Sequence, residues 1–186
     1  MSERGWRIGV PGPALNHEVT VETAAQMRDL GRQLAGLLRP GDLIILNGPL
    51  GAGKTTLTQG IGAGLGVRGP VTSPTFVISR VHPGPIPLVH VDAYRLSSAL
   101  ELDDLDLDAD TDMSVTIVEW GEGLAEELAS DRLEITIMPA RAPQEPPAPG
   151  DEPSDTGDQP RAVHVRGIGA RWQDVRMTRA DLINRL

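Results

Sequence analysis

The amino-acid sequence predicts an α/β protein in which a mixed, mainly parallel sheet is flanked by helices. Segments with the apolar pattern of strands alternate along the chain with segments of helical spacing. The stretch from Gly48 to Thr55 reads Gly-Pro-Leu-Gly-Ala-Gly-Lys-Thr and lies between such a strand and such a helix. Two further strands end in Asp92 and Glu119. Because ligands of such sheets bind at the carboxyl ends of the strands, these observations together predict a P-loop NTPase-type fold.

The individual elements follow from apolar spacing and from glycine and proline positions. The first strand is expected at 17–21, and a helix follows Thr20 or Glu22 and stops at Arg39-Pro40-Gly41. Further strands are expected at 41–47, 77–79, 88–92, 114–120, 133–138 and 162–166, and further helices from Thr55, at 98–108, at 123–130 and after Thr178.

We interpret residues 17–186 as a single P-loop domain and residues 1–16 as an irregular N-terminus. The span 139–160 differs in composition from the rest, with seven prolines and five acidic residues against one arginine. Such a segment buries too little apolar surface to order itself. We therefore expect a disordered insert between two strands of the domain, and binding of a partner is its alternative role.

The overall composition restricts the class of protein. There are no cysteines, which excludes disulfides and thiolate metal sites. No apolar run reaches transmembrane length and the N-terminus lacks an apolar signal core, so we expect a cytoplasmic protein with no membrane partner. The net charge of −9 suits neither DNA binding nor direct binding of RNA, because phosphate neutralisation needs basic surface.

The motif G-x-x-x-x-G-K-[ST] at 48–55 predicts a phosphate-binding loop. Its glycines permit a tight turn whose N–H groups point at an anion, and the following helix directs its positive N-terminus there. Lys54 is the one lysine among 17 basic residues, which suggests a position where a compact ammonium must reach the β- and γ-phosphates. Thr55 would offer its hydroxyl to Mg²⁺. The residues expected to contact the nucleotide are Gly48, Leu50, Gly51, Ala52, Gly53, Lys54, Thr55 and Thr56.

Two other patterns resemble known sites but lack the required context. The run from Gly64 to Gly69 fits G-x-G-x-x-G, yet it follows a helix, so we interpret it as the helix end and a turn. Alternating aspartates at 104–112 resemble a calcium loop that would end at Glu119. That loop needs glycine where Met113 stands, so we interpret the aspartates as a solvated acidic face.

Asp92 and Glu119 are the acidic residues expected at the site, beside Lys54. One carboxylate would hold the Mg²⁺ shell and the other would orient the attacking water, and the sequence does not assign the two roles. The alternative for each is an ordinary solvated acid. His90 is interpreted as a packed or hydrogen-bonded histidine, and Trp120 either lies beside the nucleotide or belongs to the core.

Four motifs in order resemble the TsaE (YjeE) family, the ATPase of bacterial tRNA threonylcarbamoyladenosine biosynthesis. They are Asn47 to Leu57, Ser73-Pro74-Thr75-Phe76, His90 to Leu96, and Val118-Glu119-Trp120, and the resemblance extends over 20–166. The phosphate loop alone would be generic, whereas the ordered set is much more specific.

The resemblance implies ATP and Mg²⁺ as ligands, with weak hydrolysis that depends on partners. Those partners would be the transferase TsaD and its companion TsaB, which the ATPase resets between turnovers. They modify adenosine 37 of tRNA, so tRNA contact would be indirect. By resemblance, Lys54 is the phosphate lysine, Thr55 and Glu119 hold Mg²⁺, and Asp92 is the essential acid of a switch-like segment. The Ser73 to Phe76 loop matches the family's other mobile switch.

By the same resemblance, 20–24 and the strand beginning at Arg161 approach the nucleotide. Two positions depart from the family pattern. Pro49 stands where the family often has aspartate, and Ala93 stands where it usually has leucine. Proline has no N–H, so it fits a loop position at which no amide faces a phosphate.

The residues are also compatible with two other functions. One is a module that is gated by ATP binding alone, and the other is a small-molecule kinase, for which no arginine-rich lid is visible in the sequence.

Overall fold

The computed structural model describes residues 15–74, 76–96, 98, 101–102, 112–140 and 159–175. Its elements, in chain order, are β1 (Asn16–Val21), α1 (Ala24–Ala35), β2 (Leu43–Asn47), α2 (Lys54–Gly64), β3 (Ser79–His82), β4 (Leu88–Asp92), the 3₁₀ turn η1 (Ala93–Arg95), β5 (Val115–Glu119), β6 (Arg132–Pro139), β7 (Arg161–Ile168) and the 3₁₀ turn η2 (Ala170–Trp172). None of the helices in these ranges is long and apolar enough to cross a membrane.

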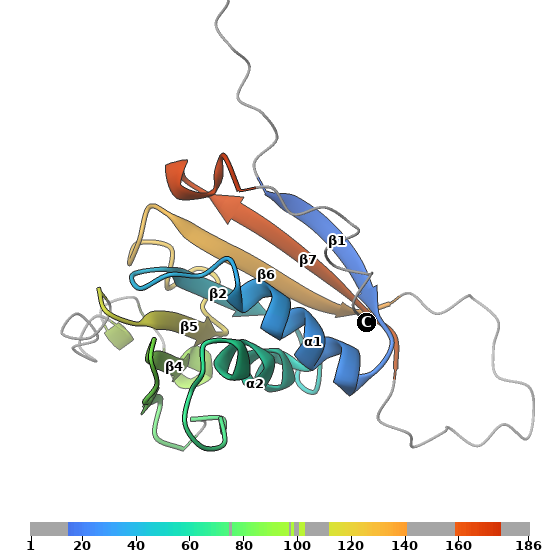
Figure 1. The fold of residues 1–186 in the computed structure, drawn as a ribbon, viewed down its shortest axis with the longest axis horizontal. Coiled ribbons are helices and arrows are strands. Elements are labelled where there is room, and N and C mark those ends of the chain that lie inside the picture. The colour runs from blue at the N-terminus through green and yellow to red at the C-terminus, as the bar shows by residue number, and fades with distance from the viewer. Residues whose placement is uncertain are drawn as a thin grey trace, which may run out of the picture.

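The strands form one seven-stranded sheet in the order β1-β7-β6-β2-β5-β4-β3. The central strands β6, β2, β5 and β4 are parallel to one another. Strands β7, β1 and β3 pair antiparallel at the two sides. The predicted mixed sheet is therefore confirmed, with its parallel part at the centre. Figure 1 shows β2 among these central strands. Along the chain, β2 is followed by the phosphate loop and then by α2.

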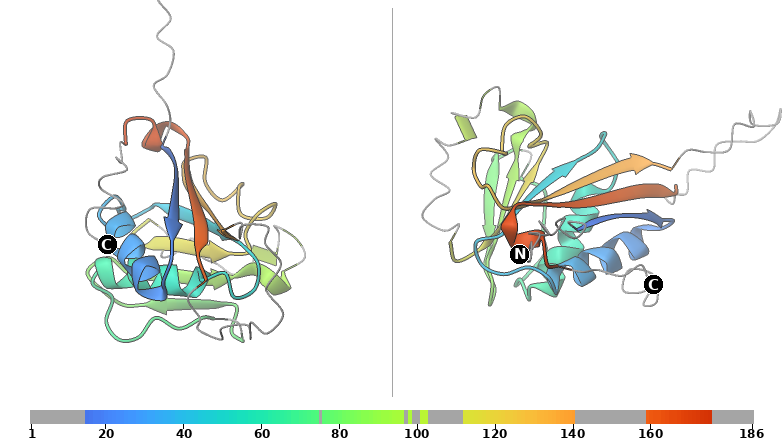
Figure 2. Two further views of the ribbon diagram at one scale, coloured as in Figure 1. Left: turned by 90° about the vertical axis from the view of Figure 1, so that its right-hand side faces the viewer. Right: turned by 90° about the horizontal axis from the view of Figure 1, so that it is seen from above.

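The sheet is covered on both faces, which explains why β2 is apolar without alternation. Ile44 and Leu46 belong to the core beneath α1 and α2, whereas Leu43 and Ile45 belong to a second core on the opposite face. Figures 1 and 2 show α1 and α2 on the same side of the twisted sheet. The opposite face is covered by segments that include Leu102 and the turns after β5.

Helices α1 and α2 approach at the level of their backbones. A Cβ atom added at Gly31 of α1 would lie 2.8 Å from Cα of Gly60, and one added at Gly60 would overlap the carbonyl of Arg28. The absence of side chains at these two glycines lets the helices meet at short range. This contact fixes the position of α2, and with it the start of that helix at Lys54.

Several predicted boundaries were wrong for identifiable reasons. The cap of α1 is Thr23, whose Oγ1 accepts a hydrogen bond from the Gln26 amide, and the helix ends at Ala35. The run 123–130 is not helical but a series of turns that begins where Gly123 adopts a φ of +79°. Strand β3 starts only at Ser79, because Ile78 has a φ of +67° and belongs to a turn closed by Pro74. The insert at 141–158, most of 98–108 and the helix after Thr178 lie outside the described residues.

Replacing Gly60 by alanine tests the close helix contact. Alanine has the better helix propensity by about 1 kcal/mol. Its methyl group would nevertheless meet the Arg28 backbone, which cannot rotate away. We expect a net loss of about 1–3 kcal/mol in the free energy of unfolding, measured by urea denaturation. The control Ala63→Gln adds atoms at an exposed position of the same helix and should change this value by less than about 0.5 kcal/mol. If Gly60→Ala and Ala63→Gln had the same free energy of unfolding, α1 and α2 would not be in close backbone contact at Gly60.

Candidate functional site

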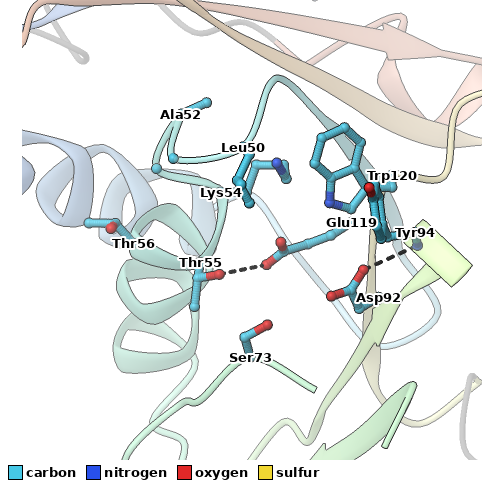
Figure 3. Close-up of a pocket in the computed structure, with 12 residues that line it drawn as sticks. Leu50, Ala52, Lys54, Thr55, Thr56, Ser73, Asp92, Tyr94, Glu119 and Trp120 are labelled. Carbon is cyan, nitrogen blue, oxygen red and sulfur yellow. Dashed lines mark hydrogen bonds between the residues drawn. The ribbon is translucent and has the colours of Figure 1, made fainter. Parts of the chain in front are cut away.

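A cleft of about 480 Å³ opens at the carboxyl ends of β2, β4 and β5, the edge at which the sequence placed the site. Figure 3 shows Lys54, Glu119, Asp92 and Trp120 around this common space. The residues that line the cleft are Leu50, Gly51, Ala52, Gly53, Lys54, Thr55, Thr56, Ser73, Asp92, Tyr94, Glu119 and Trp120. Every residue expected at the site is among them except Gly48.

The loop between β2 and α2 has the geometry that its glycines predict. Gly48, Gly51 and Gly53 all have positive φ, at +145°, +77° and +103°. A Cβ atom at Gly48 would overlap the carbonyl of Ile137 on β6, so no larger residue fits beneath the loop. Helix α2 then begins with Gly53 as its cap and without a side-chain cap, which leaves its first amides to the cleft.

Lys54 reaches back over its own loop. Its Nζ donates to the carbonyls of Gly48 at 2.8 Å and Pro49 at 3.1 Å, and lies 3.7 Å from the centre of the Trp120 ring. Burial lowers the pKa of Lys54, while the nearby charges of Glu119 and Asp92 oppose this shift. The ammonium is therefore held in a poorly hydrated position by two carbonyls and an aromatic face, and the charges of the two carboxylates stabilise it without direct contact.

The two acids are direct neighbours across the sheet. Asp92 pairs in register with Glu119 in the parallel ladder of β4 and β5, and both side chains are buried. Glu119 Oε1 accepts hydrogen bonds from Thr55 Oγ1 at 3.1 Å and from His90 Nε2 at 2.8 Å. Asp92 Oδ1 accepts from the Tyr94 amide at 3.1 Å and so caps η1. Figure 3 shows that the Thr55–Glu119 bond joins the start of α2 to the strand side of the cleft, where the Asp92–Tyr94 bond also lies.

The oxygens present fit a magnesium ion better than a metal that needs many protein ligands. Within the described ranges, no three histidine, cysteine or acidic side chains gather into a metal cluster. Thr55 and Glu119 instead supply a hydroxyl and a carboxylate that already touch each other. Mg²⁺ commonly takes only one or two protein oxygens and completes its shell with water and phosphate, which suits this pair.

Residues beside the predicted set complete the walls. Trp120 lines the cleft and is only half-buried, so it is a wall residue rather than part of the core. Its φ of +62° is unusual for a bulky residue, and its amide donates to the Leu46 carbonyl. Tyr94 and Ser73 also line the cleft, and the ring centre of Tyr94 is 5.2 Å from that of Trp120. Both residues lie within the motifs of the family resemblance, but their residue types alone did not predict a place at the site. Thr75 lies outside the described residues.

The two regions placed near the nucleotide by resemblance alone do adjoin the loop. Arg161 pairs with Val21 of β1, and its side chain lies 3.8 Å from the position of a Cβ atom at Gly53. Arg161 also lines a hollow of about 110 Å³ together with the loop residues 49–52. The beginning of β7 and the end of β1 are thus close to the phosphate loop, outside the main cleft.

The sheet, the glycine loop and the cleft define an α/β protein of the P-loop type. The family model described as threonylcarbamoyl adenosine biosynthesis protein TsaE matches residues 21–145. The tRNA threonylcarbamoyladenosine biosynthesis protein TsaE of Streptomyces coelicolor is 60% identical over 151 residues, which cover 78% of this chain and 93% of that protein. This chain therefore belongs to the TsaE family, as the four motifs indicated.

More distant relatives agree with this assignment. The Bacillus subtilis protein of the same description is 35% identical over 150 residues, covering 80% of this chain and 84% of that one. The crystal structure of Bacillus subtilis YdiB matches with a TM-score of 0.66 and 28% identity, covering 87% of this chain and 91% of that chain. The fold around the cleft is therefore shared with a solved structure.

A buried histidine at the end of β3 predicts a pH dependence of stability. Burial lowers the pKa of His82 from its ordinary 6.5, and His90 and Arg80 act in the same direction. The folded state thus binds fewer protons than the unfolded state below about pH 6.5, so stability falls as the pH drops towards the folded pKa. In urea denaturation at pH 7.5 and 5.5, His82→Gln should lose less stability between the two values than the wild type. His164→Gln, which changes an exposed histidine, should keep the full loss, and identical slopes for both variants would contradict the assignment.

Proposed function

We propose that this protein binds ATP with Mg²⁺ in the cleft and hydrolyses it, acting in the cytoplasm on the TsaD–TsaB transferase pair that forms N6-threonylcarbamoyladenosine at position 37 of tRNA. The observation that carries the proposal is the placement of Lys54 and Thr55 opposite Asp92 and Glu119 in one cleft. The role in tRNA modification is proposed from the names of the relatives, and the binding and hydrolysis of ATP are proposed from the residues of the cleft.

The phosphate loop accounts for nucleotide binding. The loop amides and the N-terminus of α2 offer donors for the β- and γ-phosphates. Lys54 currently donates to two neutral carbonyls of its own loop, and phosphate oxygens are stronger acceptors because they are charged. Its flexible side chain can exchange these carbonyls for phosphate with a small movement.

The two carboxylates divide the remaining work. Glu119 touches Thr55, so we assign these two residues to Mg²⁺, which would neutralise phosphate charge when bound. Asp92 lies beside Glu119 at the end of the neighbouring strand β4, and we assign it to hold the attacking water and accept its proton. The contact between Thr55 and Glu119 supports this assignment of the two roles, which the residue types alone left open.

The composition of the cleft supports weak hydrolysis without a partner. Lys54 is the one cation among its lining residues in the described part of the chain, and no arginine stands there. An arginine that reaches the transferred phosphoryl group accelerates related hydrolases by about 10³–10⁵. We infer that the TsaD–TsaB pair completes or reshapes this cleft. The net charge of −9 also favours partners as the holders of tRNA.

Removal of the lysine tests nucleotide binding. Lys54→Met keeps the length of the side chain but takes its charge from the phosphate position, so ATP binding by calorimetry should fall at least about 100-fold. The thermal midpoint should stay equal or rise, because the buried ammonium is poorly hydrated in the folded protein. The control Arg32→Met removes an exposed charge from α1 and should bind ATP like the wild type. Unchanged affinity in Lys54→Met would refute the site.

Hydrolysis is tested with the wild type alone and then with the TsaD–TsaB pair and tRNA. We expect the pair to stimulate phosphate release, and Glu119→Gln to reduce the stimulated rate at least about 100-fold while ATP still binds, because this variant loses the carboxylate assigned to Mg²⁺. Glu122→Gln, an exposed acid beyond the end of the same strand, is the matched control. If Glu119→Gln lost turnover yet still supported tRNA modification, binding alone would suffice. The protein would then be a nucleotide-gated module.

A further inference from the structure

His90 lies in the centre of β4 and is fully buried, two residues before Asp92. Its Nε2 atom is 2.8 Å from Oε1 of Glu119 on the neighbouring strand β5. The interaction joins two residues that are 29 positions apart in sequence, so it depends on the register of the two strands. His90 has no place in the nucleotide chemistry described above, because it lies behind Glu119 and does not line the cleft.

The contact constrains one particular oxygen of Glu119. Oε1 accepts from both His90 Nε2 and Thr55 Oγ1, and the two donors come from β4 and α2. In the described part of the chain, no hydrogen bond is made to Oε2, and Glu119 lines the cleft. A carboxylate held by one oxygen from two sides cannot rotate freely, so its second oxygen keeps a fixed orientation.

The surroundings of the imidazole determine which nitrogen carries the proton. An ionised carboxylate only accepts, so the 2.8 Å contact requires a hydrogen on Nε2. The Nδ1 atom is buried and has no partner among the described residues. A hydrogen on Nδ1 would have no acceptor there. The geometry therefore places a hydrogen on Nε2, directed at Glu119.

We propose that His90 is a positioning residue, whose Nε2–H group holds the Glu119 carboxylate so that its second oxygen faces the Mg²⁺ position of the cleft. This inference rests on the function proposed above. Histidine or carboxylate partners behind a metal ligand commonly set the orientation of that ligand, and their loss costs about 10–100-fold in metal affinity. The residue acts through Glu119 and has no contact with the nucleotide itself.

The first test needs neither nucleotide nor partner. Long-range ¹H–¹⁵N spectra of the full-length protein at pH 7.5, assigned with His90→Gln, report which imidazole nitrogen is protonated. We expect hydrogen on Nε2 of His90, because this atom faces Glu119. Hydrogen on Nδ1 alone would overturn the proposal, because Nε2 would then have no hydrogen to donate.

The second test compares ATP affinity with and without Mg²⁺ by calorimetry in three variants. His90→Leu removes the donor and should lower the gain in affinity that Mg²⁺ provides by about 10–100-fold, while binding of ATP without metal stays near the wild-type value. His90→Gln carries an amide that can donate at the place of Nε2 and should stay within about threefold of the wild type. His82→Leu removes a buried histidine 6.1 Å away, measured between ring centres, that does not touch Glu119, and should also keep the gain.

The outcomes separate this inference from the proposed function. A wild type that binds Mg²⁺ and ATP but never hydrolyses ATP with its partners would refute the ATPase and leave the binding comparison valid. A wild type with no effect of Mg²⁺ on affinity would overturn both. An equal gain in His90→Leu and wild type would overturn the positioning role alone. If circular dichroism shows that His90→Leu does not fold, the folded His90→Gln variant and the position of the imidazole hydrogen are used instead. Loss of the Mg²⁺-dependent gain in ATP affinity in His90→Gln, together with the absence of hydrogen on Nε2 in the wild type, would overturn the positioning role.

Discussion

The site depends on the parallel pairing of β4 with β5 and of β5 with β2. This pairing brings the carboxyl ends of three strands to one edge of the sheet, so that the phosphate loop, Asp92 and Glu119 meet there although they are far apart in sequence. A shift of one residue between β4 and β5 would turn one of the acids to the opposite face. Because β4 and β5 are buried on both faces, a shifted strand would mispack its apolar side chains, and it would also separate His90 from Glu119.

The cleft holds a lysine and two acids in a poorly hydrated space, which costs folding free energy unless the charges are paired. The structure meets this cost through short contacts rather than through solvent. Lys54 is satisfied by carbonyls and an aromatic ring, Glu119 by Thr55 and His90, and Asp92 by a main-chain amide. The bulky Trp120 adopts a positive φ to form one wall, and such strain is typical of functional sites. The cleft therefore combines buried charges with local strain, a combination that is common at functional sites.

The part of the structure that could be predicted is the part with strong local chemistry. The glycine loop, its strand and helix, and the acids at the ends of β4 and β5 follow from motif and apolar pattern. The wrong boundaries came from residues whose backbone is decided by tertiary contacts, such as Ile78 and Gly123. The bond between His90 and Glu119 depends on strand register, and residue types alone predicted only that His90 is packed or hydrogen-bonded. The nucleotide, its metal and the partners remain proposals.

The main chain of Ile78 links the turn after Pro74 to Asp92 at the end of β4. Its carbonyl accepts a hydrogen bond from the Asp92 amide at 2.8 Å, and its own amide donates to the Pro74 carbonyl, where the turn begins. The left-handed conformation of a β-branched residue stores about 1–3 kcal/mol. Because the link is main chain to main chain, any ligand or protein that straightens this turn must also pull on the strand end that carries Asp92. Mechanical tension in this surface segment is thereby transmitted to the end of β4 that carries the buried carboxylate of Asp92, whatever side chains the segment has.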